Sequence, residues 1–341
     1  MAEEFPDRQI ELAHGAGGKA SRRLIEGLIL PRLSNPVLNK LSDAAMIDAG
    51  GRPLAFTTDS FVVKPLAYPG GNIGSLAVYG TINDLAVSGA RPLAILATLI
   101  LEAGTATTVV EEALDAMAGA SSRSGVPVVG GDTKVVEHGK ADGIYITTSG
   151  IGEPVPGINL DPETVEPGDK IILTGPIGDH GITVLLARGE LDIEADLRSD
   201  SRSVWPLVEA LLQSCGQSVR WMRDPTRGGV ATSLNELAGD SGRTIVIEDT
   251  RIPVRDVVRG ACEVLGLDVL HVANEGQCLA IVAADAADRA IAAIRSVPGG
   301  EDAVIIGAVS AERNPRLIAT TPYGSSRIVD MLVGDQLPRI C

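Results

Sequence analysis

Two clusters of proline and glycine near the middle of the chain, residues 153–157 and 166–169, interrupt a regular succession of strand-like and helix-like stretches. Alternating elements of this kind are typical of domains that mix α and β structure. The alternation restarts after the second cluster, and 341 residues suffice for two domains of ordinary size. The sequence therefore predicts an α+β fold with domains over 1–155 and 156–331, followed by a tail over 332–341 that lacks periodicity.

The periodicity of apolar residues places the main elements. Strands are expected over 54–63, 92–101, 126–129, 144–150 and 170–174. Helices are expected over 73–88, 107–124, 182–187, 228–239 and 287–295. Helix 73–88 is apolar apart from the pair Asn83-Asp84. Because an uncompensated charge in an apolar helix is costly, this pair indicates a functional position.

The charge balance excludes several classes of function. Lys and Arg total 29 against 44 Asp and Glu, so the net charge is −15. A chain this acidic repels both a phosphate backbone and an anionic membrane, although it can bind a nucleotide through divalent cations. The acidic start of the chain lacks the basic and apolar regions of a signal peptide, so we expect the protein in the cytoplasm.

The four cysteines also divide into two groups. Cys215, Cys262 and Cys278 form no CxxC pair and no zinc spacing, and we expect them to be small buried side chains. Cys341 ends the chain, where residues are normally exposed. An accidental terminal thiol is the alternative to a functional one.

Five aspartates stand beside glycine, threonine or other small residues. Any one of them is compatible with the commonest role of aspartate, as a turn former or helix cap. Taken together they indicate a magnesium–phosphate site, because hard oxygen ligands hold the metal and small neighbours leave room for a triphosphate. We expect these aspartates at the ends of strands or in loops, apart from the one in helix 73–88. They are Asp43, Asp59, Asp84, Asp132 and Asp224.

A glycine-rich loop, His14–Lys19, precedes a helical stretch near the N-terminus. Glycines let backbone amides surround an anion, and a lysine can contact phosphate. The loop does not match the P-loop pattern. A plain glycine turn accounts for it equally well.

In combination these motifs resemble the ATP-binding superfamily that contains aminoimidazole ribonucleotide synthetase, selenophosphate synthetase and thiamine-monophosphate kinase. Within it the chain is most similar to the carbamoyl dehydratases of hydrogenase maturation, the HypE family. A reactive cysteine near the glycine loop, as in selenophosphate synthetases, is missing here, since the first cysteine is Cys215. The resemblance spans nearly the whole chain and rests on residues 14–19, 58–63, 69–74, 83–85, 129–136, 222–230 and 338–341.

The resemblance implies an N-terminal domain that binds ATP and dimerises through its sheet, a C-terminal α/β domain and a mobile tail. ATP would lie between the domains, near the dimer interface. Magnesium would bind Asp43, Asp59, Asp84 and Asp224, although the single acid in residues 41–45 leaves the number of metal ions open. The residues implied to contact ATP are His14, Gly17, Gly18, Lys19, Thr58, Asn83 and Asp132.

The reaction implied by the resemblance is the ATP-dependent dehydration of an S-carbamoyl group on Cys341 to a thiocyanate, which supplies cyanide to the iron of [NiFe] hydrogenase. Glu275 is a candidate base. Lys134 is either a cation that stabilises phosphate or, with a lowered pKa, a base itself. The implied partners are a second copy of the chain, the carbamoyltransferase HypF and a HypC–HypD type iron scaffold.

The tail carries the chemistry in this hypothesis. Gly334 is expected to act as a hinge, and Pro338 to stiffen the last residues into an extended form. One alternative is a kinase or synthetase of the same superfamily that acts on a free small molecule and works without the last four residues. Another is an ATP-binding scaffold that forms no ADP.

Overall fold

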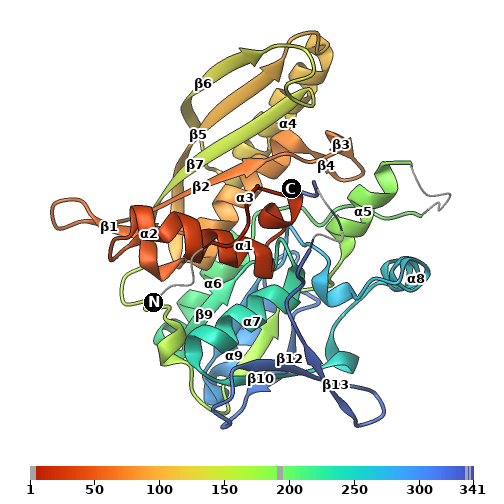
Figure 1. Cartoon of the computed structure of the whole chain (residues 1–341). Helices are drawn as coiled ribbons and strands as arrows, with labels where there is room; N and C mark the ends of the chain where they lie inside the picture. The colour runs from red at the N-terminus through yellow and green to blue at the C-terminus, as the bar shows by residue number, and fades with distance from the viewer. Residues whose placement is uncertain (1–4, 190–194, 335–336, 338) are drawn as a thin grey trace.

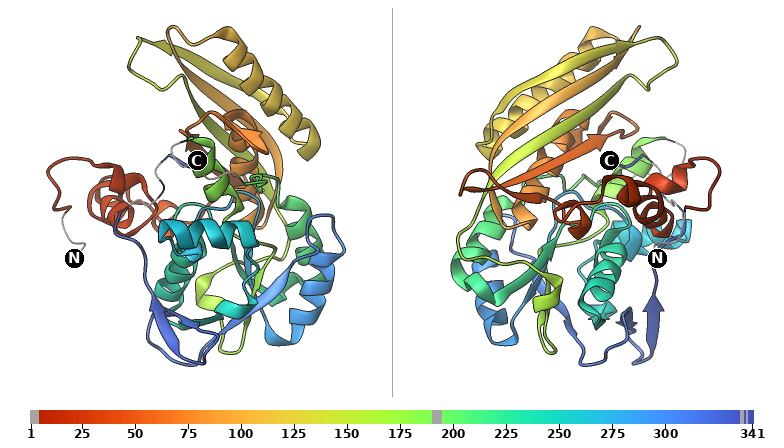
Figure 2. Two further views of the ribbon diagram at one scale, coloured as in Figure 1. Left: turned by 90° about the vertical axis from the view of Figure 1, so that its right-hand side faces the viewer. Right: turned by 60° about the vertical axis from the view of Figure 1, so that its left-hand side comes forward.

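The computed structural model describes residues 5–189, 195–334, 337 and 339–341, so Pro338 lies outside the described residues. Its first sheet has five strands, and all neighbours pair antiparallel except the parallel β5 and β6. Helices α3 (Ile73–Val87) and α4 (Thr107–Ser124) cover one face of it (Figure 2). The strand order is β1 (Ala45–Asp48), β2 (Pro53–Phe61), β7 (Ile144–Pro154), β5 (Ala90–Glu102) and β6 (Val128–Val136).

Helix α3 is buried at every residue except Asp84. Asn72 caps its start by accepting hydrogen bonds from the amides of Gly74 and Ser75. A side chain at Gly74 would place its Cβ 1.8 Å from the carbonyl oxygen of Ala113, so glycine allows α3 and α4 to pack closely. The apolar character of α3 follows from its place between the first sheet and the second domain.

The second domain is built on a seven-stranded mixed sheet (Figure 1). Helix α7 (Gly229–Ser241) packs on one face, and α6 (Trp205–Cys215) and α9 (Ala287–Arg295) pack on the other. Helices α5 (Asp179–Ala187) and α8 (Asp256–Leu265) lie beside each other at a third apolar cluster. The strand order is β14 (Ser326–Val329), β13 (Arg316–Thr320), β10 (Thr244–Glu248), β12 (Val304–Val309), β8 (Lys170–Leu173), β11 (Leu279–Val282) and β9 (Val219–Arg223).

The first helices of the chain and its C-terminal residues lie at the junction of the two domains. Short helices α1 (Lys19–Leu24) and α2 (Leu30–Leu33) lie over it (Figure 1), and a small hairpin of β3 (Ala67–Tyr68) and β4 (Gly71–Asn72) connects β2 to α3. The C-terminus ends between the first sheet and the second domain (Figure 1), with Ile340 buried in the core of the first. None of the described helices is long and apolar enough to cross a bilayer.

The two-domain α+β prediction is confirmed, while the boundary between 155 and 156, which falls between the sheets, and the mobility of the tail stay predictions. Two local predictions were wrong: the bounds of the strand expected over 126–129, and the placement of Asp59 and Asp132 at strand ends. The strand expected over 126–129 is β6, which continues through the Gly-Gly-Asp motif. Glycine serves strand pairing there, because a Cβ at Gly131 would lie 1.7 Å from the Ala97 carbonyl oxygen. Asp59 and Asp132 therefore lie within strands rather than at their ends.

Candidate active site

Four of the five predicted aspartates meet at the junction of the domains. Asp43 precedes β1, Asp59 lies on β2, Asp84 on α3, and Asp224 follows β9. They line a cavity of about 210 Å³, the carboxylate cavity, and oxygens of Asp43, Asp84 and Asp224 lie within 4.8 Å of one another. The other lining residues are Thr57, Thr58, Gly80, Arg223, Thr226, Arg227, Glu275 and Cys341.

Local structure explains why these carboxylates converge. The pleat of β2 turns Thr57 and Asp59 to the side of α3, where Asp84 is the one residue of the helix that is not buried. The Thr57 hydroxyl lies 2.8 Å from Asp84 Oδ2 and 2.8 Å from the carbonyl oxygen of Asp43. Thr57 thereby links β2, α3 and the segment before β1 at the carboxylate cavity.

The electrostatics of the cavity favour a bound cation. Burial raises the pKa of Asp43, Asp59 and Asp84, and it raises that of Asp224 to about 7. Neighbouring carboxylates raise the pKa of Asp84 further. These acids, with Glu275, face two guanidinium groups. Arg223 Nε lies 3.1 Å from Asp43 Oδ1, and Arg227 Nη2 lies 3.9 Å from Asp59 Oδ1. Clustered hard oxygens with an excess of negative charge fit Mg²⁺.

Glu275 closes the other side of the cavity. Its side chain is 2% exposed, and its Oε1 has no hydrogen-bond partner among the described residues. Burial, followed by the charges of Asp224 and Asp59, raises the pKa of Glu275 well above its ordinary value. The backbone is fixed, because its amide donates to Asp200 Oδ1 at 3.1 Å. A buried acid with an unused oxygen, in the cavity that Cys341 also lines, can exchange protons with a group bound there.

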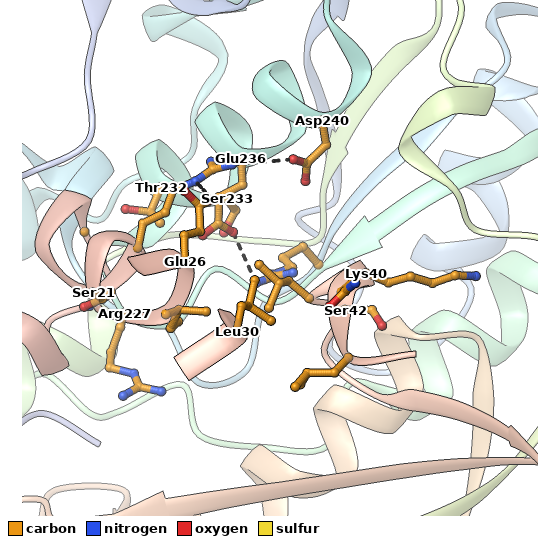
Figure 3. A pocket seen from close by; sticks show the side chains of 18 of the residues that line it. Ser21, Glu26, Leu30, Lys40, Ser42, Arg227, Thr232, Ser233, Glu236 and Asp240 are labelled. Atoms are coloured by element: carbon orange, nitrogen blue, oxygen red, sulfur yellow. Dashed lines mark hydrogen bonds and ion pairs between the residues drawn. The ribbon is translucent and has the colours of Figure 1, made fainter. Parts of the chain in front are cut away.

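A second, larger cavity adjoins the first and is here called the outer cavity. It has a volume of about 930 Å³ and is lined by the glycine loop, α1, α2, residues 37–42 and α7. Figure 3 shows Thr232, Ser233, Glu236 and Asp240 on the α7 wall, and Ser21, Glu26 and Leu30 on the opposite wall. Arg223, Asp224, Thr226 and Arg227 line both cavities. The two cavities therefore form one continuous site.

The glycine loop shapes this site by close packing. His14, Gly17 and Gly18 line the outer cavity. Gly17 has φ +78°, and a Cβ there would lie 2.7 Å from Arg227 Cβ. A Cβ at Gly18 would lie 2.2 Å from the carbonyl oxygen of Leu332. Side chains at these positions would push Arg227 and the C-terminal segment out of place.

Family models match both halves of the chain. Residues 41–153 match "AIR synthase related protein, N-terminal domain", and residues 166–320 match the corresponding C-terminal domain. The chain is 49% identical to the carbamoyl dehydratase HypE of Azotobacter vinelandii, over 97% of each chain. It is 41% identical to that of Escherichia coli, over 97% of this chain and 99% of the relative.

The chain belongs to the HypE family. Solved structures agree with this assignment. A HypE–HypF complex has a chain with 42% identity and a TM-score of 0.86, over 91% of this chain and 99% of that chain. A HypE solved in complex with ATP has 43% identity and a TM-score of 0.80, over 98% and 100% of the two chains. The family resemblance found in the sequence is thereby confirmed.

Three other predicted site residues of this HypE family member take different places. Thr58 lines the carboxylate cavity. Lys19 forms an ion pair with Asp330 and lies outside both cavity linings. Asn83 is buried, and its side-chain amide donates to the carbonyl oxygens of Arg202 at 3.0 Å and Glu275 at 3.2 Å. Asn83 therefore positions Glu275, and direct ATP contacts from all three stay predictions.

Asp132 and Lys134 are not brought to the carboxylate cavity within one chain. Both are exposed on β6, where Lys134 Nζ lies 2.7 Å from Asp132 Oδ2. The strand register places Asp132 in one row with Thr98, Thr147 and Ser60, on the face opposite α3. We call this the open sheet face; it also carries the half-exposed side chains of Phe56 and Leu96.

Sequence reasoning missed the cations of the site. Arg223 and Arg227 flank Asp224, inside a motif already recognised as significant. The excess of acids in the predicted set was a signal that nearby basic residues must balance part of the charge. The three buried cysteines are as predicted, with Cys215, Cys262 and Cys278 each at most 6% exposed.

Proposed function

We propose that this chain is an ATP-dependent carbamoyl dehydratase that converts an S-carbamoyl group on its own Cys341 into a thiocyanate. The observation that carries the proposal is that Cys341 lines the same cavity as the four aspartates and Glu275. Relatives named carbamoyl dehydratase, and a relative solved with ATP, support the assignment of reaction and cofactor.

The two cavities suit the two halves of ATP. We infer that the nucleoside occupies the outer cavity and that the triphosphate passes Thr226 and Arg227 into the carboxylate cavity. Asp43, Asp84 and Asp224, with Asp59 beside them, are the residues that would hold Mg²⁺. When bound there, Mg²⁺ neutralises charge on the transferred phosphoryl group.

The reaction needs a leaving group better than hydroxide. In the proposed sequence the amide oxygen of the S-carbamoyl group bonds to the γ-phosphorus, and the bond from that phosphorus to ADP breaks. The C–O bond then breaks, phosphate leaves, and both protons leave the nitrogen to give S–C≡N. Thiocarbamate and ATP thus become thiocyanate, ADP, phosphate and a proton. Attachment to the chain makes the transfer intramolecular, which removes much of its entropic cost.

Glu275 is the residue we assign to proton removal from nitrogen. Its unpartnered Oε1 is available to accept an N–H group, and its raised pKa makes its carboxylate a stronger base than an exposed glutamate. Arg227 lines the same cavity, and negative charge at Cys341 is the first cause of its raised pKa. We assign to Arg227 the stabilisation of negative charge beside the thiol.

We further propose a homodimer formed through the open sheet face. Strand β6 is an edge strand that is exposed from Val128 to Val135, and apolar side chains such as Leu96 are uncovered beside it. Exposed edges and apolar patches of this kind are normally covered in assemblies. A second copy would bring its Asp132 and Lys134 towards Ser60, which lines a small cavity shared with Cys341. Lys134 would then stabilise charge in the neighbouring site.

Two further partners and a compartment complete the proposal. A solved HypE–HypF complex of relatives supports HypF as carbamoyl donor. A HypC–HypD type scaffold as cyanide acceptor rests on the family resemblance. None of the four cysteines forms a disulfide, which suits the reducing cytoplasm.

Counting ADP tests the proposal against its alternatives. The full-length chain, carbamoylated on Cys341 and given ATP and Mg²⁺, should form one ADP per carbamoyl group and then stop. Cys341→Ser, which cannot carry the thiocarbamate, should form none. Continuous ADP formation with a free small molecule after removal of the last four residues would instead establish a kinase or synthetase. If the carbamoylated chain forms no ADP, the dehydratase is excluded and the ATP-binding scaffold remains.

A further inference from the structure

The last three residues of the chain are held by contacts from residues 62–64, Asp142 and α5, here together called the tail seat. The amide of Val62 donates to the main-chain oxygen of Cys341 at 3.2 Å, and that of Lys64 donates to the carbonyl oxygen of Arg339 at 3.0 Å. Arg339 Nε in turn lies 3.3 Å from the carbonyl oxygen of Val62. Two main-chain hydrogen bonds and one side-chain contact therefore tie the tail to the segment after β2.

His180, at the start of α5, binds the middle of this tripeptide. Its Nε2 lies 3.0 Å from the carbonyl oxygen of Ile340, and its Nδ1 lies 2.7 Å from Ser199 Oγ. Because a carbonyl oxygen only accepts, Nε2 must carry the proton, and the Ser199 hydroxyl must donate to Nδ1. Burial lowers the pKa of His180 to about 4, so the ring stays neutral and keeps this arrangement.

Asp142 binds the side chain of Arg339, the first residue of this tripeptide. Its carboxylate forms an ion pair with the Arg339 guanidinium, and Lys64 Nζ lies 3.3 Å from the same carboxylate. The loop that carries Asp142 is fixed from below, since Glu102 accepts hydrogen bonds from the amides of Gly139 and Gly143. The aspartate is thus presented to the tail by a held loop.

Two features show that this segment is held in a defined conformation. Ile340 is 4% exposed and packs in the core of the first domain. Arg339 has φ +58°, and in the described part of the chain Leu41 is the one other non-glycine residue with a positive φ. This left-handed backbone costs about 1 kcal/mol or more for a residue with a side chain. The contacts that Asp142, His180 and residues 62–64 make with the tail must offset that cost.

We propose that Asp142 and His180 are positioning residues that seat the tail with Cys341 at the mouth of the carboxylate cavity. Asp142 recognises the Arg339 side chain, and His180 recognises the Ile340 backbone whatever its side chain. The chemical consequence rests on the proposed function, because a seated Cys341 presents its carbamoyl group to ATP. The seating itself does not depend on that chemistry.

A charge-swap cycle tests the role of Asp142 in the full-length chain. Iodoacetamide alkylation of Cys341 is followed by mass spectrometry of the C-terminal peptide, without ATP or a carbamoyl donor. Asp142→Arg and Arg339→Asp should each raise the alkylation rate roughly three- to tenfold, the size expected for a half-exposed charge pair. The double variant should return towards the wild-type rate. Single variants at the wild-type rate, or a double variant with multiplied effects, would overturn the assignment.

Matched substitutions test His180. Gln can place an N–H near the position of Nε2, whereas Leu offers no donor. His180→Gln should alkylate within about twofold of wild type, and His180→Leu severalfold faster. Equal rates in both variants would contradict the hydrogen-bonding role. The buried thiols of Cys215, Cys262 and Cys278 report folding, since they must stay unmodified in every variant.

A second readout separates this inference from the proposed function. With the alkylation rate of the free C-terminal peptide as the limit for an unseated tail, the alkylation rates give the seated fraction of each variant. Single-turnover dehydration by the carbamoylated variants, at saturating ATP, should fall in proportion to that fraction. A dehydration rate that does not follow the seated fraction would remove the positioning role and leave the dehydratase intact. A wild-type chain that protects Cys341 from alkylation but never dehydrates its carbamoyl group would exclude the proposed function and leave the positioning of the tail intact.

Discussion

The buried carboxylates of the cavity and the exposed Asp132 on β6 belong to one predicted set, yet their surroundings are opposite. Burial and like charges raise the pKa of Asp84, whereas hydrogen bonds from Lys134 and the Thr133 amide lower the pKa of Asp132. The fold of a single chain brings the cavity carboxylates together, and they outnumber the basic side chains beside them. Asp132 is already paired with Lys134 and is exposed. This difference supports the proposal that one chain builds the metal site and that the β6 pair acts on a neighbouring copy.

The largest effect should come from the cavity. Asp84→Asn keeps the shape and removes the charge, so we expect ADP formation by the carbamoylated chain to fall roughly 10²–10³-fold. The measurement is the rate of ADP formation as a function of Mg²⁺ concentration. The exposed Asp115→Asn on α4 is the control and should change this rate by less than about twofold. A rate within a few-fold of wild type would remove Asp84 from the metal site.

Lys134 should matter almost as much, despite its exposure. Lys134→Ala is expected to lower the dehydration rate roughly 10–100-fold, because a charge-stabilising cation is lost from the neighbouring site. Nucleotide binding by the mutated chain should stay intact, since its own cavities are unchanged.

Mixing two inactive variants sharpens this point. In a mixture of Lys134→Ala with Asp84→Asn, each mixed dimer has one complete site, so activity should recover to roughly a quarter of wild type. Such recovery requires that Lys134 act across the dimer. A mixture as inactive as its components would show that Lys134 acts within its own chain or not at all.

The raised pKa values predict how the metal-free protein responds to pH. The pKa of Asp224 is 3.8 ordinarily and about 7 in the folded chain. Its proton therefore stabilises the fold fully below about pH 4, and this stabilisation is lost as the pH rises to about 7. The Tm of the metal-free wild type should fall between pH 5 and 7.5, and Mg²⁺ should reverse the fall. Asp224→Asn should show a flatter profile; an equal slope would exclude Asp224 as its source.

Lys19 should show the smallest effect. Its pair with Asp330 is largely exposed, with 42% and 65% of the two side chains accessible. Lys19→Ala is expected to change the KM for ATP by less than about threefold and the free energy of unfolding by less than about 0.5 kcal/mol. Arg227→Ala, at the junction of both cavities, should raise that KM at least about tenfold. The reverse order would favour the phosphate contact that the glycine loop suggested.

The sequence predicted elements well where periodicity was long and apolar, as in α3 and α4. It could not place Asp59 and Asp132 within strands, because glycine and threonine beside an acid also mark turns, and only strand pairing decides between them. The convergence of Asp43 with Asp224 depends on contacts between two domains, which no local pattern encodes. The same holds for His180, whose partner Ile340 lies 160 residues away along the chain.

The central claim is that Cys341 carries the reacting group, and the mass of the C-terminal peptide tests it most directly. The full-length chain is incubated with HypF, carbamoyl phosphate, ATP and Mg²⁺, with Cys341→Ser as the matched control. A carbamoyl adduct on Cys341 should appear and then lose one water in an ATP-dependent step. A stable adduct that never loses water, or modification at Cys215, Cys262 or Cys278 instead, would contradict the claim.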